Sequence, residues 1–329
     1  PILNWEAVRK AIKTGLAFNA EINPKSIFDR KHYFYPDLPQ SYQITQFYEP
    51  IVKDGYLMIN AEDGSEKKIR INRAHLEQDA GKLMHDLVPG KTVVDLNRSG
   101  VPLLEIVSDP DIKSPFEATE YIKNLRAILR AVETSSADME KGEMRCDINI
   151  SVMPLGSSVF GTRCEVKNVN SIRFAAKAIE YEANRQVEEI EAGREIFAET
   201  RLFDANLGIT KSMRRKETAE DYRYMPDPDL KPVIIELEEV EEIKREILEL
   251  PFDKQKRYIS ELGISKDDAI LLTSESEFYT FYEEMLNFSS NPKLCASILT
   301  SELFGLLNKA GLSLAGCKIN ARNLSSLVN

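Results

Sequence analysis

The sequence has few cysteines and no long apolar run, and each absence excludes a class of protein. No stretch approaches the ~18 consecutive apolar residues that a membrane-spanning helix requires, so we expect no membrane association. No two cysteines form a C-x-x-C pair, so neither a zinc knuckle nor a disulfide framework is indicated. The four cysteines are Cys146, Cys164, Cys295 and Cys317.

The motifs of several common enzyme folds are also missing. The sequence contains neither the G-x-x-x-x-G-K-[ST] loop of P-loop proteins nor the G-x-G-x-x-G turn of dinucleotide-binding domains. It also lacks the serine nucleophile elbow of α/β-hydrolases and the H-E-x-x-H motif of zinc proteases. A catalytic site in this chain must therefore be built from other elements.

Length and charge limit the organisation and the kind of ligand site. The 329 residues correspond to two or three domains at about 100–200 residues per domain. Lys and Arg number 43 and Asp and Glu 53, which gives a net charge of −10, so a site for RNA or a nucleotide must be a local basic patch. Residue 1 is proline and not methionine, and we expect the chain to be a fragment that lacks both ends of a longer protein.

Hydrophobic periodicity predicts an α+β domain with an antiparallel sheet over residues 1–235. A hairpin is expected over residues 55–78, with its turn at Asp63-Gly64-Ser65, and a short apolar strand contains Glu105. The other expected strands cover residues 143–152, 162–168, 199–206 and 209–215, and the expected helices cover residues 4–16, 114–132 and 171–192.

The composition changes at Glu236, where strand patterns end. Glutamate-rich, helix-periodic segments separated by Pro251, Pro292 and several glycines predict a small all-helical domain over residues 236–310. The last dozen residues are expected to begin a further segment that is cut off.

Charged residues of both signs gather on the polar face of the predicted strands. Alternation places them together, and carboxylates interleaved with arginines and lysines suit a Mg-nucleotide site, because Mg²⁺ prefers oxygen ligands and cationic groups hold phosphates. A structural network of ion pairs on a wet face is the alternative that this pattern leaves open. The residues are Arg73, His75, Glu77, Glu105, Arg145, Asp147, Asn149, Arg163, Glu165, Lys167 and Arg201.

Three of these residues form the most specific part of the pattern. Glu105 is a single acid within the apolar run VPLLEIV, and a half-buried carboxylate is costly unless it is paired or binds a cation. His75 and Glu77 have the two-residue spacing that directs both side chains to one side of a strand. The spacing suits a pair of metal ligands, although a solvated histidine would give the same pattern.

Two clusters combine basic and aromatic residues. Lys31, Tyr33 and Tyr35 lie in the run KHYFY, where they could stack a base and hold a phosphate or could form the aromatic edge of a core. Tyr222 and Arg223 lie in the later run DYRYMPDPDL, for which a surface loop is the alternative.

Six segments, in order from residue 28 to residue 230, resemble the family of B subunits of the glutamyl/aspartyl-tRNA amidotransferase GatCAB. Several are long enough to be highly specific, whereas residues 236–310 match the family more weakly. The segments are FDRKHYFYPDLPQSYQITQF, RAHLEQDAGK, VDLNRSGVPLLEIVSDPDI, MRCDINISV, EVKNVNS and DYRYMPDPDL.

The resemblance implies a cradle domain of glutamine-synthetase-like character, a helical domain and a truncated tRNA-binding tail domain that begins with residues 311–329. It implies an ATP- and Mg²⁺-dependent ligase that phosphorylates the side-chain carboxylate of Glu on tRNA(Gln), of Asp on tRNA(Asn), or of both. Ammonia from the A subunit then gives the amide. The implied partners are the A and C subunits and the charged tRNA, and the implied compartment is the bacterial cytoplasm, with a mitochondrial or plastid matrix as the alternative.

The resemblance also assigns roles to residues. Glu77 and Glu105 match metal ligands of the family, His75 is grouped with them, and the two glutamates are the expected catalytic residues. The basic residues at positions that suit phosphates are Lys31, Arg145, Lys167 and Arg201, and the candidates for contacts with the substrate are Tyr33, Tyr35, Asp147, Glu165, Tyr222 and Arg223.

A different class of function fits the same residues. In a non-catalytic tRNA-binding scaffold, the charged face would only position the acceptor end, and RNA binding would depend on salt but not on Mg²⁺. An ordinary small-molecule ligase is a third hypothesis, but the sequence contains no motif that supports it.

Overall fold

The computed structural model describes residues 2–215 and 219–328, with all their side chains except those of residues 86, 214, 215, 219 and 220. These residues form two compact units: unit 1 with residues 1–122 and 138–246, and unit 2 with residues 123–137 and 247–329. Helices and strands are mixed, as the sequence predicts. None of the described helices has the length and apolar content needed to cross a membrane.

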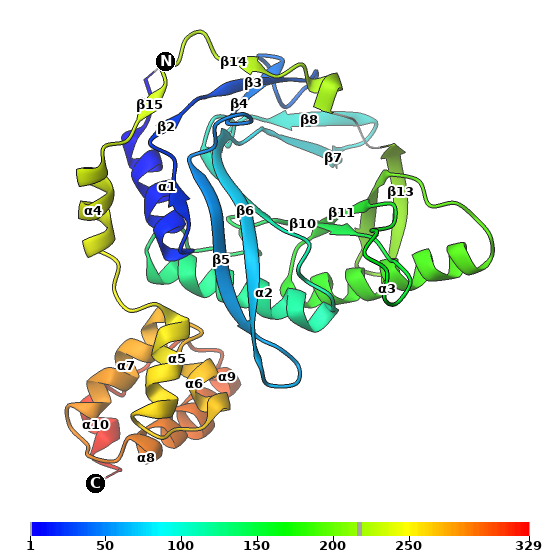
Figure 1. Ribbon diagram of the computed structural model, residues 1–329. Coiled ribbons are helices and arrows are strands. Elements are labelled where there is room, and N and C mark those ends of the chain that lie inside the picture. The colour runs from blue at the N-terminus through cyan, green and yellow to red at the C-terminus, as the bar shows by residue number, and fades with distance from the viewer. Residues whose placement is uncertain (1, 216–218, 329) are drawn as a thin grey trace. The chain divides into compact units, whose positions relative to one another are not determined.

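The first sheet of unit 1 is built on a long antiparallel hairpin (Figure 1). Its hairpin and its turn confirm the prediction for residues 55–78, and the strand order is β1-β5-β6-β9. All three pairings in this sheet are antiparallel. The strands are β1 (Glu21–Ile22), β5 (Val52–Asn60), β6 (Glu66–Gln78) and β9 (Pro102–Ser108).

The alternation along β6 changes at one point. Its pairing with β9 shifts register between Ile71 and Arg73, as at a β-bulge. The buried residues are Ile69 and Ile71 before the shift and Ala74 and Leu76 after it. Beyond the shift, the polar residues Arg73, His75 and Glu77 therefore alternate with Ala74 and Leu76, which enter the core.

Helix α1 (Trp5–Ala17) covers the core side of this sheet, as Figure 1 shows. The Asn4 side chain caps the helix by accepting a hydrogen bond from the amide of Glu6, which confirms the predicted start. Val8 and Ile12 are fully buried and share a core with Ala74 of β6. Burial of each such side chain contributes about 1.5–3 kcal/mol, and α4 (Leu237–Arg245) adds Ile243 to the same core.

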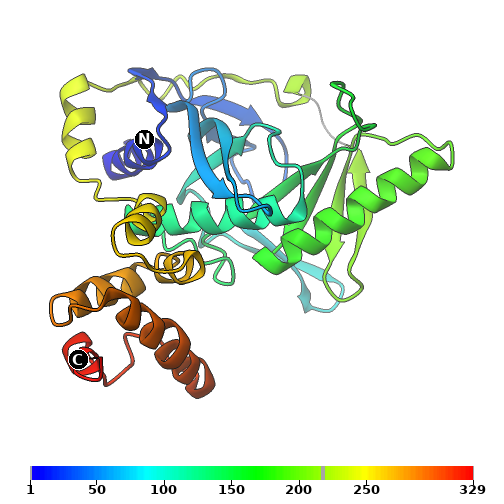
Figure 2. The same ribbon diagram turned by 60° about the horizontal axis from the view of Figure 1, so that its bottom comes forward.

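The second sheet of unit 1 has the order β10-β11-β12-β13. β11 and β12 pair in parallel, and the remaining pairs are antiparallel. Helix α3 (Ile172–Glu191) is the crossover between these two strands, and it runs along the sheet (Figures 1 and 2). The strands are β10 (Cys146–Ile150), β11 (Cys164–Val169), β12 (Glu199–Asp204) and β13 (Ile209–Arg215).

The second sheet corrects two expectations. The sheet is not wholly antiparallel, because the helix between β11 and β12 returns the chain to the same end before β12 starts. The predicted single polar face is also wrong: in the described chain no backbone pairing joins β6 or β9 to β10. His75, Glu77 and Glu105 lie in the first sheet, whereas Asp147 and Lys167 lie in the second.

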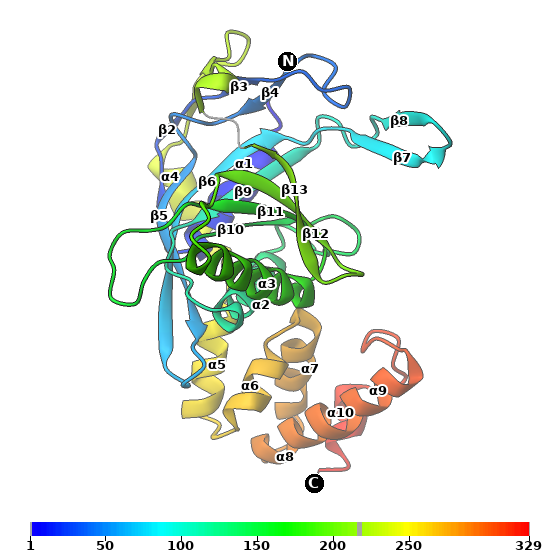
Figure 3. The same cartoon turned by 90° about the vertical axis from the view of Figure 1, so that its right-hand side faces the viewer.

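Three small sheets complete the strands of unit 1. The sheet β14-β3-β4 and the pair β15-β2 bring residues near 225–234 beside residues near 25–45, and the pair β7-β8 forms a separate ribbon (Figure 3). The strands are β2 (Lys25–Ser26), β3 (Asp29–His32), β4 (Tyr42–Thr45), β7 (Lys82–Val88), β8 (Lys91–Asp95), β14 (Met225–Pro226) and β15 (Val233–Ile234).

Unit 2 consists of helices in the part of it that the structure describes. Helix α2 (Pro115–Ala131) crosses from unit 1 into unit 2, and Ser114 Oγ accepts from the amide of Glu117, which confirms the predicted start of this helix. Tyr258 and Tyr282 are fully buried at the centre, with ring centroids 5.1 Å apart.

The predicted domain boundaries at residues 235 and 310 stay predictions. The other helices are α5 (Pro251–Ser260), α6 (Lys266–Leu272), α7 (Ser276–Leu286), α8 (Pro292–Ser297), the π-helical η2 (Ile298–Leu303), α9 (Phe304–Ala310) and α10 (Ala321–Ser325).

Candidate active site

Three potential metal ligands meet on the first sheet. His75 and Glu77 are two residues apart on β6, and Glu105 on β9 is the direct partner of His75 in the ladder. His75 Nε2 lies 3.6 Å from Glu77 Oε2 and 3.5 Å from Glu105 Oε2. One ligand atom from each residue lies within 4.8 Å of the other two. The register of β6 and β9 thus creates the cluster that alternation predicted for these three residues.

The donor set fits a divalent cation. Neither Glu77 nor Glu105 forms an ion pair with a lysine or arginine of the described chain, and the nearest group that could carry a positive charge is the imidazole of His75. The Glu77 side chain is 9% exposed and that of Glu105 is 50% exposed, so the cost of uncompensated negative charge falls mainly on Glu77. Two carboxylate oxygens suit Mg²⁺, which usually completes its coordination with waters and phosphate oxygens, and the imidazole also suits transition metals.

The cluster opens into a pocket of about 210 Å³. This volume is below the ~300–1,000 Å³ typical of sites for drug-sized ligands, so the pocket can enclose reacting groups more readily than a whole nucleotide. Thr45 Oγ1 lies 3.5 Å from Glu77 Oε2 at its wall. The lining residues are Lys31, Thr45, Phe47, Arg73, His75, Glu77, Glu105, Val107 and Tyr224.

Stacked aromatic rings form one wall of the pocket. Phe47 and Tyr224 have centroids 3.9 Å apart and planes inclined by 10°. Burial raises the pKa of the Tyr224 phenol to about 12, and the negative charges of Glu105 and Glu77 add to the effect. Tyr224 is therefore a neutral phenol at physiological pH.

Lys31, a predicted phosphate-binding residue, lies in the pocket wall beside other predicted residues. Its Nζ is 4.7 Å from the centroid of the Tyr222 ring and 5.7 Å from that of Tyr33, distances typical of cation–π contacts. The Tyr33 ring is in edge contact with Tyr35, and burial, followed by the charge of Glu77, raises the Tyr33 pKa. The two basic-aromatic clusters of the sequence thus form one cluster.

Arg223 contributes backbone geometry near this cluster. Its φ is 46°, and its carbonyl oxygen lies 3.0 Å from His32 Nδ1. The left-handed conformation is uncommon for a non-glycine residue. Arg223 lies in the chain between Tyr222, which contacts Lys31, and Tyr224, which lines the pocket.

The other predicted residues are not among those that line the pocket. Arg145 Nη2 donates to Asp79 Oδ2 at 2.6 Å, and Lys167 Nζ lies 2.7 Å from Asp147 Oδ2 and 3.5 Å from Glu165 Oε1. Burial alone would lower the pKa of Lys167, but the two carboxylates raise it overall. These contacts match the network of ion pairs that the sequence left open as the alternative.

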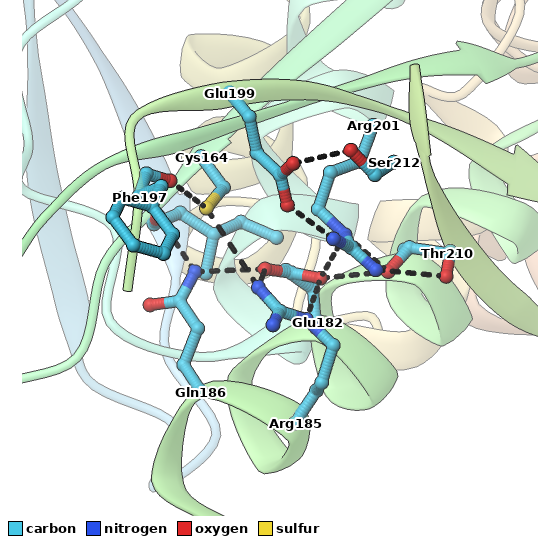
Figure 4. Close-up of polar contacts among 10 residues, drawn as sticks. Cys164, Glu182, Arg185, Gln186, Phe197, Glu199, Arg201, Thr210 and Ser212 are labelled. Atoms are coloured by element: carbon cyan, nitrogen blue, oxygen red, sulfur yellow. Dashed lines mark hydrogen bonds and ion pairs between the residues drawn. The ribbon is translucent and has the colours of Figure 1, made fainter. Parts of the chain in front are cut away.

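Arg201 lies in a buried network between β12, β13 and α3 (Figure 4). Its Nε donates to Thr210 Oγ1 at 2.9 Å and lies 3.1 Å from Glu182 Oε2, and its Nη2 donates to the Thr210 carbonyl at 3.0 Å. Its Nη1 pairs with Glu199. With its side chain 10% exposed, Arg201 uses its donors inside the protein.

Glu182 is the buried centre of this network. It is fully buried on α3, and it accepts hydrogen bonds from Arg185, Gln186 and Thr210, as Figure 4 shows. Burial alone would raise its pKa, but these hydrogen bonds and the charge of Arg185 lower it overall. Sequence patterns predicted no role for Glu182, because a glutamate on an amphipathic helix is usually solvated.

Several pocket residues were not singled out from the sequence. Arg73 was placed on the polar face without a role, Tyr224 belongs to the later basic-aromatic run but was given no role, and Thr45, Phe47 and Val107 were not chosen at all. Phe47 and Tyr224 end up stacked although they are far apart in the chain. Both lie in segments that carry the family resemblance, which was the signal available for them.

The sequence of this chain belongs to a known class of protein. The chain belongs to the GatB/GatE catalytic domain family, whose sequence model matches residues 1–241. Proteins named as the B subunit of aspartyl/glutamyl-tRNA(Asn/Gln) amidotransferase are similar to it along its whole length. One from Wolbachia sp. subsp. Brugia malayi (strain TRS) and one from Wolbachia pipientis wMel are each 54% identical over 329 residues, which is 100% of this chain and 68% of the relative. One from Rickettsia rickettsii (strain Sheila Smith) is 53% identical over 328 residues, with the same coverage. The resemblance inferred from the sequence is confirmed.

Proposed function

We propose that this protein is the B subunit of a tRNA-dependent amidotransferase and that its pocket activates a carboxylate. In this proposal it transfers the γ-phosphoryl group of ATP, with Mg²⁺, to the side-chain carboxylate of Glu on tRNA(Gln), of Asp on tRNA(Asn), or of both. Ammonia then replaces the phosphate. The relatives named as subunits of an amidotransferase support the overall reaction.

The observation that carries the proposal is the cluster of His75, Glu77 and Glu105 in a pocket with Lys31. These three residues would hold Mg²⁺, which neutralises charge on a transferring phosphoryl group when it is bound. Lys31 would hold a phosphate oxygen, because its ammonium group has no carboxylate partner in the described chain. Phosphate contacts by Arg145, Lys167 and Arg201 stay predictions.

The chemistry needs two displacements. An oxygen of the substrate carboxylate bonds to the γ-phosphorus while the bond from that phosphorus to the ADP oxygen breaks, which gives an acyl phosphate. Ammonia then bonds to the acyl carbon, inorganic phosphate leaves with the C–O bond electrons, and the nitrogen loses a proton. A pocket of about 210 Å³ with a stacked aromatic wall favours amidation over hydrolysis, because it limits the access of water to the acyl phosphate formed in the first step.

The proposal extends to the setting of the reaction. We propose that A and C subunits complete a heterotrimer, with ammonia supplied by the A subunit from glutamine. We also propose that unit 1 corresponds to a glutamine-synthetase-like cradle and that the helices after it form a separate all-helical domain. The compartment that suits a charged-tRNA substrate and bacterial relatives is the bacterial cytoplasm.

The decisive experiment is transfer of label from γ-³²P-ATP to Glu-tRNA and Asp-tRNA by the assembled subunits, with and without Mg²⁺. Transfer by the wild type and its loss in Glu77→Gln and Glu105→Gln is the expected result. Glu21→Gln is the matched control, because Glu21 is an exposed carboxylate on β1 of the same sheet. The control should transfer label at the wild-type rate.

The same proteins also distinguish the kinase function from the rival function of a non-catalytic scaffold, when tRNA binding is measured beside label transfer. A non-catalytic scaffold would bind tRNA with equal affinity whether or not Mg²⁺ is chelated, and with a strong dependence on salt. Equal label transfer in the wild type and both pocket variants would show that the two carboxylates are structural. It would remove the proposed site even though the family assignment stands.

A further inference from the structure

Arg73 is a second cation in the pocket, and the proposed reaction gives it no role. It lies on β6, two residues before His75, and its ladder partner on β9 is Val107, which also lines the pocket. Burial lowers the pKa of Arg73, and the negative charge of Glu105 opposes that shift. Arg73 forms no ion pair with a carboxylate in the part of the chain that the structure describes.

The backbone holds this guanidinium in place before a ligand arrives. Nη2 of Arg73 donates to the carbonyl oxygens of Gln46 and Phe47, the latter at 2.7 Å. Its Nε is buried without a hydrogen-bond partner, and no described residue accepts from Nη1. Since a guanidinium carries five N–H donors, most of its capacity is unused. A side chain fixed in this way loses little entropy when it binds an anion.

The surroundings of Arg73 differ from those of Lys31. Arg73 is accompanied in the pocket by Val107 and by the stacked rings of Phe47 and Tyr224, which are apolar surfaces. Lys31 reaches the pocket from β3 among the rings of the basic-aromatic cluster. Apolar walls beside a guanidinium fit an aliphatic chain that ends in a carboxylate better than they fit a polyphosphate.

We propose that Arg73 binds the carboxylate that accepts the phosphoryl group, and that Lys31 is left to bind phosphate. The Nη1 donors that are left free can hold a carboxylate oxygen from a fixed position, whereas the lysine ammonium acts as a point charge on a flexible chain. Arg73 would hold the acceptor beside the metal-ligand cluster, because the pair Arg73–Val107 lies two ladder positions from the pair His75–Glu105. This inference rests on the proposed function, and it assigns the acceptor class as an aliphatic carboxylate.

The test measures the binding of two simple anions to the full chain in the presence of Mg²⁺. Glutarate represents the acceptor carboxylate and is followed by ¹H saturation-transfer NMR, and inorganic phosphate is followed by its ³¹P line width. We expect Arg73→Gln to weaken glutarate binding by about tenfold to a hundredfold, because a charge-assisted hydrogen bond is lost. Phosphate binding should change by less than about threefold.

Controls separate binding from folding. Arg70→Gln is the matched variant, because Arg70 lies on the same strand, is exposed and pairs with Asp111. Mn²⁺ binding and thermal unfolding report whether the pocket of each variant is intact. Arg73→Lys keeps the charge but loses the two backbone contacts that fix the guanidinium, and it should bind glutarate several-fold more weakly than the wild type, so it carries the test if Arg73→Gln does not fold.

The outcomes distinguish this inference from the proposed function. Unchanged glutarate affinity in both Arg73 variants, absence of glutarate binding by the wild type, or loss of phosphate binding alone would overturn the role of Arg73. Loss of both anions together would also overturn it, because Arg73 would then be a general anion site. The proposed function is judged separately, by Mg²⁺-dependent label transfer in the wild-type assembly.

Discussion

His75 on β6 and Glu105 on β9 are directly opposite each other in an antiparallel ladder, with Nε2 and Oε2 3.5 Å apart. This relationship is set by strand register, because a slip of one residue would turn one of the two side chains to the other face. Glu77 follows at the next position on the same face of β6. The cluster of three potential metal ligands therefore depends on the pairing of two strands and not on a loop.

The first prediction concerns divalent cations. Glu105→Gln and His75→Ala should each weaken Mn²⁺ binding by about tenfold or more, because each removes one of three neighbouring ligand groups. Mn²⁺ is suited to electron paramagnetic resonance, which measures the free ion directly. Glu21→Gln is the control and should bind Mn²⁺ as the wild type does. Equal affinity in all four proteins would mean that the cluster does not bind a cation.

The second prediction concerns the buried network around Glu182. Glu182→Gln should lower the free energy of unfolding by about 3–5 kcal/mol, because Arg185 and Arg201 would lose the buried carboxylate that both contact. Urea denaturation at pH 7 measures this change. Glu189→Gln is the matched control on the same helix, since Glu189 pairs with Arg194 at the surface and its loss should have little effect. Equal destabilisation by both variants would contradict the prediction.

The third prediction is the pH dependence of the same network. The pKa of Glu182 is lowered from its usual 4.5 in the folded protein, so the folded state binds this proton less tightly than the unfolded state. Its contribution to stability is therefore complete above pH 4.5 and is lost as the pH falls through the lower, folded pKa. Urea denaturation from about pH 7 to about pH 3 should show a steeper loss in the wild type than in Glu182→Gln. Parallel curves would show that Glu182 does not cause the acid sensitivity.

Local patterns predicted the long helices and the hairpin of unit 1, but not the ribbon β7–β8 or the short strands β1, β2, β14 and β15. Asn4 and Ser171 cap the helices that the sequence predicts. The hairpin of β5 and β6, whose second strand contains His75, has the predicted turn. Alternation also brought His75 and Glu77 together correctly, because both lie on one strand. These features depend on residues close together in the chain, which is the range over which periodicity and capping signals act.

Long-range pairing is the part that the sequence patterns could not supply. The parallel pairing of β11 and β12 depends on how α3 crosses the sheet, and nothing in either strand signals it. The stacking of Phe47 on Tyr224 joins segments far apart in the chain, which only the small sheet around β3 brings together. The burial of Glu182 depends on its partners on β12 and β13, so helical periodicity alone suggested a solvated residue.

The fourth prediction separates the roles of Lys31 and Arg201, which the sequence placed in one class of phosphate-binding residue. Lys31→Ala should weaken the binding of inorganic phosphate by about tenfold and leave the free energy of unfolding nearly unchanged, because Lys31 has only cation–π contacts in the described chain. Arg201→Gln should do the opposite and cost about 3 kcal/mol of stability or more, because it leaves Glu182 buried without one of its two cations. ³¹P NMR with Mg²⁺ and urea denaturation measure the two quantities on the same samples.

Arg163→Gln is a suitable control for both, since Arg163 is exposed just before β11. A loss of phosphate affinity in Arg201→Gln at unchanged stability would show that Arg201 leaves its buried partners to bind phosphate, and it would return Arg201 to the role that the sequence suggested.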